Sequence, residues 1–140
     1  MNKLSWLLLL IVQVAVAQNR NELNSGWVCA AIGSVKASGE KISVASYSTK
    51  DWLPATVPGT VLTTLLNNKK VPDPFYGMNN EKIPDIYKTG RDHYTYWFVK
   101  DFTEKAPTAN QQVWLHFRGV NYSCDVFLNG KKVNSARHYV

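Results

Sequence analysis

Aromatic rings and hydrogen-bonding side chains crowd two short stretches of the 140-residue sequence, VPDPFYGMN at 71–79 and GRDHYTYWF at 90–98. The two prolines of the first stretch fix backbone angles and remove amide donors, so a stiff, extended loop is expected to present Phe75 and Tyr76. One interpretation is a loop that closes a hydrophobic core, where most large apolar residues lie. The other is a sugar-facing surface, because pyranose rings offer apolar C–H faces to aromatic rings and hydroxyls to carboxylates.

The sequence contains no motif that pairs a nucleophile with its base. Its three histidines lie outside any recognisable arrangement of serine, cysteine and acid. Hydrolysis of a glycosidic bond needs two carboxyl groups about 5 to 10 Å apart across the sugar. Asp92 could face Asp73 or Asp85 in this way, and the alternative for each is a solvated acid in a turn. No catalytic residue is therefore assigned from the residues themselves.

Cys29 and Cys124 are the two cysteines, and they lack the spacing of metal ligands, so neither a metal site nor a cofactor is expected. In an exported protein they could form a disulfide. Both also lie in apolar runs, where a buried thiol packs as a small hydrophobe. The net charge of +6 comes from lysines that stand singly or in pairs, not from a basic stripe with interleaved rings, which argues against nucleic acid.

Residues 1–17, MNKLSWLLLLIVQVAVA, have the pattern of a secretory signal peptide. A lysine precedes an apolar run, and Ala15-Val16-Ala17 supplies the small residues that signal peptidase accepts. The run is too short and too poorly flanked to suit a membrane span, so no membrane association is expected. The sequence therefore predicts cleavage after Ala17, a secreted or periplasmic protein, and one domain over residues 18–140.

Alternating apolar residues at short spacing predict a mostly antiparallel β domain. Residues 27–35 and 41–48 flank a turn-forming ASGE and are expected to pair with each other. Strands are also expected at 94–102, where rings lie on both faces, and at 111–119. This last strand and the following hairpin are expected to supply five core residues, which are Val113, Leu115, Phe117, Val126 and Leu128.

Two local sequence patterns predict structure more specifically than this alternation does. Asn129-Gly130 stands between two β-prone runs and predicts a two-residue hairpin turn, with the lysines that follow it exposed. Residues 60–70, TVLTTLLNNKK, repeat apolar positions at spacings of three and four, with Thr60 or Gly59 as N-cap, and predict one short helix. One short helix among many strands favours an all-β sandwich.

The motifs PGTVL, DPFYG, GRD-x-YT-x-WF and GVNYS-x-x-VFLNG follow one another in the sequence. Because these motifs occur in this order, the chain resembles the N-terminal sugar-binding domain of glycoside hydrolase family 2 over roughly residues 20–138. The resemblance is to the branch of exo-β-D-glucosaminidases and mannosylglycoprotein endo-β-mannosidases. The resemblance implies a jelly-roll β-sandwich of the galactose-binding type, placed before an immunoglobulin-like domain and a (β/α)8 barrel. It also implies that the catalytic glutamates belong to the barrel.

The resemblance assigns no catalytic role to Glu22, Glu40, Glu81 or Glu104, because the matching region is not the barrel. It does imply motif positions that could border a sugar pocket. These substrate-contact candidates are Asp73, Phe75, Tyr76, Asn79, Arg91, Asp92, Tyr94 and Trp97. About half of them are expected to be structural, with Tyr94 and Trp97 as core rings and Arg91 and Asp92 as a loop ion pair.

Where family members continue into a further strand, this chain ends after SARHYV, which predicts a fragment truncated at its C-terminus. Two functional interpretations stay open. In the first, the chain is the substrate-side domain of a secreted β-glycosidase that acts on β-linked glucosaminide or mannoside, partnered by a downstream barrel and inactive alone. In the second, it is a stand-alone exported carbohydrate-binding module. A non-functional relic that folds poorly is a third possibility.

Overall fold

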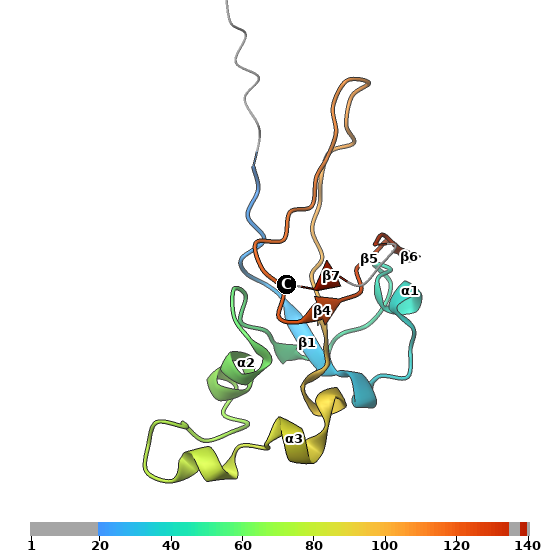
Figure 1. The fold of residues 1–140 in the computed structure, drawn as a ribbon. Helices are drawn as coiled ribbons and strands as arrows, with labels where there is room; N and C mark the ends of the chain where they lie inside the picture. Colours follow the sequence, from blue (N-terminus) through green and yellow to red (C-terminus); the bar gives the residue numbers. More distant parts are fainter. Residues whose placement is uncertain (1–19, 135–137, 140) are drawn as a thin grey trace, which may run out of the picture.

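A computed structural model describes residues 20–134, 138 and 139, and its centre is a three-stranded antiparallel sheet (Figure 1). Strand β1 (Val28–Ala31) lies in the middle, between β2 (Leu53–Pro54) and β3 (Tyr96–Val99). Cys29 faces Leu53 on one side and Phe98 on the other, and it is almost completely buried. The predicted strands at 27–35 and 94–102 are therefore present but shorter. The predicted signal peptide lies outside the described residues.

Helix α2 (Val61–Asn67) confirms the helix predicted from the 60–70 pattern. It begins where expected, because the Thr60 side chain accepts a hydrogen bond from the Thr63 amide at 3.1 Å, which satisfies one of the free N–H groups of the first turn. Its inner face buries Thr64 and Leu65. The Thr64 hydroxyl accepts the Thr56 amide at 3.0 Å, so this buried polar group ties the helix to the segment that follows β2.

The prediction of a strand at 41–48 paired with 27–35 is wrong. Residues in this region instead form α1 (Gly39–Ile42), preceded by the 3-10 turn η1 (Ile32–Ser34). The physical reason is that β1 already pairs on both edges, with β2 and β3, so it has no edge left for a third strand. The single helical turn of α1 buries Gly39 and Ile42.

Three more short helical segments follow α2 in the sequence: η2 (Asn79–Lys82), α3 (Ile86–Thr89) and η3 (Arg91–Tyr94). They lie on residues 71–94, called here the excursion, which leaves the sheet at the lower end in Figure 1. The chain thus has several short helices where the sequence predicted one. None of the helices in the described residues is long and apolar enough to cross a membrane.

The C-terminal region confirms the predicted tight turn. Strands β5 (Phe127–Leu128) and β6 (Lys131–Lys132) pair across Asn129 and Gly130, whose φ angles of 48° and 82° are both positive. Two positive φ angles are the signature of the type I′ turn that Asn-Gly favours. The lysines of β6 are exposed, as predicted. A second pair joins β4 (Ser123–Cys124) to β7 (His138–Tyr139).

The prediction of a buried strand at 111–119 is wrong. Residues 101–120, called here the arm, run away from the sheet and turn back at residues 109–110 without strand structure (Figure 1). Val113, Leu115 and Phe117 are 59%, 47% and 47% exposed, and Leu128 is also exposed, while Val126 is half-buried. Alternation decides which side chains share a face, but a strand also needs a neighbour to pair with its backbone, and the described residues supply none here.

The described residues accordingly form small antiparallel sheets and short helices but no closed sandwich. Cys29, Ile42 and Leu65 are the buried hydrophobic residues among them, and Cys29 is the most deeply buried. Cys29 and Cys124 are free thiols, which excludes a disulfide between them in this structure. Burial raises the pKa of both thiols, and the nearby Asp125 carboxylate adds to the effect at Cys124.

The C-terminal hairpin is joined to the rest of the described chain at the Phe127 ring and at its turn. The Phe127 ring meets the Trp97 ring of β3 edge to face, at 5.9 Å between centroids, and it also lies against Gly39 of α1. The hairpin is also held at its turn, where the Gly130 amide donates to the Ser43 hydroxyl at 3.0 Å. The short strands β5 and β6 are thus positioned by α1 and β3, in addition to their own pairing.

We expect Gly39→Ala to lower the free energy of unfolding by about 1 to 3 kcal/mol, the usual cost of overpacking. A Cβ at residue 39 would lie 2.5 Å from Cζ and 2.6 Å from Cδ2 of Phe127, a ring that also packs edge to face on Trp97, so the ring must shift to accommodate it. Chemical denaturation followed by tryptophan fluorescence measures the change. Gly33→Ala is the matched control, because a Cβ there has no atom within 4 Å. Equal stability of the two variants would contradict the packing described.

Candidate functional site

The first four substrate-contact candidates lie on the outer part of the excursion. Asp73 accepts the Phe75 amide at 2.9 Å, so its carboxylate shapes the turn that carries the rings. Phe75 and Tyr76 point to solvent, with 97% and 78% of their surface exposed. The Asn79 side chain accepts a hydrogen bond from the Lys82 ammonium at 3.1 Å, within η2. This part of the excursion therefore presents bare rings beside polar groups held by local hydrogen bonds.

Tyr87 is a third bare ring on the excursion, 95% exposed on α3, and the sequence reasoning missed it. Helix α3 begins at Asp85, whose carboxylate accepts the Tyr87 amide at 2.9 Å. The IPDIYKTG stretch contains the signal for this arrangement, since an Asp before a short helix is a typical N-cap and Tyr87 is the second residue after it.

The second four candidates lie closer to the sheet. The Arg91 guanidinium lies 5.2 Å from the centre of the Tyr122 ring and donates to its hydroxyl at 3.2 Å, so it contacts Tyr122 and forms no ion pair with the exposed Asp92. Tyr94 donates from its hydroxyl to the carbonyl of Pro84. Burial, helped by the Asp85 carboxylate, raises the pKa of Tyr94.

Trp97 lies in β3, half-buried against Phe127, and contributes to packing. Its indole Nε1 is buried and has no hydrogen-bond partner among the described residues. The eight candidates thus divide into an outer group, residues 73–79, and an inner group, residues 91–97. The hydrogen bonds of the described chain do not join the two groups, and Asp73 and Asp85 each shape their own turn.

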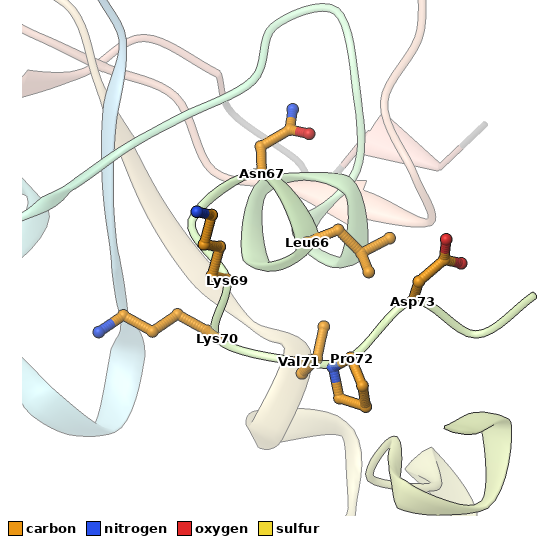
Figure 2. Close-up of a pocket in the computed structure, with 7 residues that line it drawn as sticks. All are labelled: Leu66, Asn67, Lys69, Lys70, Val71, Pro72 and Asp73. Atoms are coloured by element: carbon orange, nitrogen blue, oxygen red, sulfur yellow. The ribbon is translucent and has the colours of Figure 1, made fainter. Parts of the chain in front are cut away.

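A groove of about 680 Å³ opens at the start of the excursion, beside the last turn of α2 (Figure 2). Figure 2 shows Leu66 directed from the helix toward Asp73, with Lys69 and Lys70 on the other side of the helix end. Neither ammonium forms an ion pair with the described residues. The groove therefore combines an apolar floor with a carboxylate and two free cations. Its lining comprises Leu66, Asn67, Lys69, Lys70, Val71, Pro72 and Asp73.

Sequence reasoning placed Asp73 at this site but overlooked the two lysines, which it treated as ordinary surface charge. The signal was present, because Asn67-Asn68 stops the helix and the next two residues must lie at its end. Lys69 has a positive φ of 55°, which turns the chain away from the helix axis. Among the described residues, no three histidine, cysteine or acidic side chains gather in a way that could hold a metal ion.

Comparison with known proteins agrees with the family suggested by the motifs. The glycosyl hydrolase 2 galactose-binding domain-like family matches residues 35–139. A mannosylglycoprotein endo-beta-mannosidase of Lilium longiflorum is 50% identical over 113 residues, which cover 79% of this chain and 12% of the lily protein. No solved structure matches the chain.

Two further relatives are more distant. An exo-beta-D-glucosaminidase of Streptomyces avermitilis is 32% identical over 109 residues, covering 78% of this chain and 11% of the relative. A beta-mannosidase of Bos taurus is 36% identical over 92 residues, covering 62% of this chain and 10% of the relative. The chain thus spans only about a tenth of the length of these relatives. With its motifs and its family match in agreement, the chain belongs to the glycosyl hydrolase 2 galactose-binding domain-like family.

Proposed function

We propose that this domain binds β-linked carbohydrate through the excursion, as the substrate-side domain of a secreted family 2 glycosidase that acts on β-mannoside or β-glucosaminide. The observation that carries the proposal is the set of three bare rings, Phe75, Tyr76 and Tyr87, on one segment of the chain. The proposal takes these rings to form one binding face, because contiguous exposed apolar patches often mark binding sites. The names of the relatives support a β-linked mannoside or glucosaminide as the ligand.

The chemistry of the excursion suits such a ligand. Aromatic faces can stack on the C–H face of a pyranose, while carboxylates, amides and ammonium groups orient its hydroxyls. The groove beside α2 supplies Asp73, Lys69 and Lys70 at the foot of the excursion. Because turn geometry holds the Asp73 carboxylate in place, it can accept hydrogen bonds from sugar hydroxyls with little further ordering.

We assign hydrolysis itself to the barrel of a longer polypeptide, and we propose that the domain closes into a jelly-roll sandwich there. The described residues hold Asp73 and Asp85 in separate turns, which supports binding over catalysis for this segment. A stand-alone binding module is the second candidate. The length of the relatives, of which this chain spans about a tenth, favours the first. Reading the gene downstream of residue 140 distinguishes the two.

Replacing Tyr76 or Tyr87 with alanine should weaken binding of β-1,4-linked mannose or glucosamine oligosaccharides about tenfold. Covering one ring face removes roughly 55 Å² of apolar surface from water, or about 1.4 kcal/mol, which is a factor of ten in affinity. Isothermal titration calorimetry measures the change. Trp114→Ala is the control, since Trp114 is an equally bare ring, 81% exposed, on the arm. Loss of binding only with Trp114→Ala would place the sugar elsewhere.

The purified chain should not hydrolyse aryl β-mannosides or aryl β-glucosaminides. The physical reason is that a retaining or inverting mechanism needs two carboxyl groups that face each other across the sugar. Release of the chromogenic aglycone, followed over hours at high protein concentration, measures the activity. Turnover that disappears when one of the chain's own acids, such as Asp92, is replaced by asparagine would show that this segment is itself catalytic.

We also propose export, with cleavage between Ala17 and Gln18, on the strength of the AVA-Q junction. Mass spectrometry of protein secreted by an expression host should find a chain that starts at Gln18, in part cyclised to pyroglutamate. Ala17→Arg is the matched control, because a bulky charged residue at the cleavage position should block processing. Mature protein that retains Met1 and stays inside the cell would refute this proposal.

A further inference from the structure

Lys69, which lines the groove beside α2, has a backbone conformation that lysine rarely adopts. Its φ is 55°, in the left-handed region that glycine enters freely and other residues enter at a cost. It follows the C-cap residue Asn68, at the position where helices usually place glycine. Because a lysine is found there instead, the strain points to a role for its side chain.

The end of α2 does not need this lysine as a cap. The carbonyls of residues 64–66 each accept a backbone amide from residues 68–70, at 2.8 to 3.0 Å. The Asn68 side chain also donates to the Thr64 carbonyl, at 2.8 Å. The helix dipole favours a cation at this end, but Lys70, which has no positive φ, already supplies one. Capping of the helix therefore does not explain Lys69.

The groove keeps its opposite charges apart. Figure 2 shows Lys69 and Lys70 on one side of the helix end and Asp73 on the other. Both lysines are exposed, and neither ammonium forms an ion pair with the described residues. The Asp73 carboxylate accepts the Phe75 amide at 2.9 Å, which holds it in its own turn. Two neighbouring cations without a counter-charge favour an anionic group, to which an ammonium donates charge-assisted hydrogen bonds.

We propose that this groove takes a sugar unit that carries an anionic substituent, a carboxylate or a phosphate ester. The inference rests on the proposed function, since it names a further property of the carbohydrate that the excursion binds. The apolar lining covers a C–H face of the ring, Asp73 accepts from a hydroxyl, and the anionic group lies at Lys69 and Lys70. A neutral sugar would leave both ammonium groups without a counter-charge.

Two ligands that differ in one group per sugar test the inference. β-1,4-linked tetramannuronate and β-1,4-linked mannotetraose share length and linkage, but the first carries a carboxylate where the second carries a hydroxymethyl group. In low salt we expect the mannuronate to bind about four- to tenfold tighter in calorimetric titration, because each exposed ion pair contributes about a factor of two to three. In about 0.5 M salt, screening should reduce the preference to less than about twofold.

Three variants locate the contact. Lys69→Gly should reduce the preference for mannuronate about two- to threefold while stability stays equal or rises, because glycine suits the positive φ and the helix end keeps its hydrogen bonds. Adding Lys70→Gln should abolish the preference. Lys36→Gln removes an exposed lysine outside the groove lining and should leave the preference unchanged, which separates the groove from the net charge. Thermal unfolding of each variant measures the stability.

A second pair, mannose 6-phosphate and mannose, tests the phosphate ester, with inorganic phosphate as the control. A preference for the charged member in one pair alone would support the inference and assign the substituent to that class. No preference in either pair, with mannotetraose still bound, would overturn the inference and leave the proposed function standing, whereas binding of no sugar would overturn both. A preference that survives the double substitution, or inorganic phosphate bound as tightly as mannose 6-phosphate, would also contradict the inference.

Discussion

The structure depends on the position of one ring. Phe127 contacts both Gly39 of α1 and Trp97 of β3, and these contacts help to hold the C-terminal hairpin against the N-terminal sheet. Only glycine fits at position 39, because any Cβ would overlap the ring. The contact also lies beside the buried indole N–H of Trp97, for which the described residues offer no acceptor. An unsatisfied buried donor costs about 1 to 3 kcal/mol, so the packing around Phe127 must outweigh it.

The features predicted correctly from sequence are those that local chemistry decides. Helix α2 needs only its apolar spacing and the Thr60 cap, and the Asn129-Gly130 turn needs only residues that accept positive φ. The predictions of strands at 41–48 and 111–119 are wrong because strand pairing depends on residues that are distant in the sequence. The first had no free edge of β1 to join, and the second has no neighbour within the described residues.

At the candidate site, too, the sequence predicts local features but not the contacts between segments that are distant in the sequence. The prolines in VPDPFYG predict a stiff loop that presents Phe75 and Tyr76, but the sequence left open whether these rings close a core or face outward, and the structure shows both exposed. Whether rings on different short elements share a surface depends on how η2, α3 and η3 are placed, which the sequence does not reveal. For the same reason, Tyr87 and the lysines at the end of α2 were missed, and the pairing of Arg91 with Tyr122 was not foreseen.

Sheet, hairpin and helix α2 form the ordered body from which two apolar surfaces extend. The excursion and the arm both project from the sheet (Figure 1), and both carry exposed large apolar side chains: Phe75, Tyr76 and Tyr87 on the excursion, and Val113, Trp114 and Leu115 on the arm. The two segments also differ in backbone pairing: short helical turns pair backbone groups in the excursion, whereas among the described residues the backbone of 111–119 forms one such bond, from the Gln111 amide to the Thr108 carbonyl. The chain matches about a tenth of the length of its relatives, and these exposures hold for that part alone.

Amide hydrogen exchange of the isolated chain, resolved by residue, tests the central claim that a paired sheet supports an open arm. The amides of β1 and β3 should exchange slowly, because each strand pairs with a neighbour and Cys29 is buried between them. The amides of residues 112–118 should exchange at nearly the rate of an unstructured peptide. Protection of the arm equal to that of β1, in a monomer, would contradict the account.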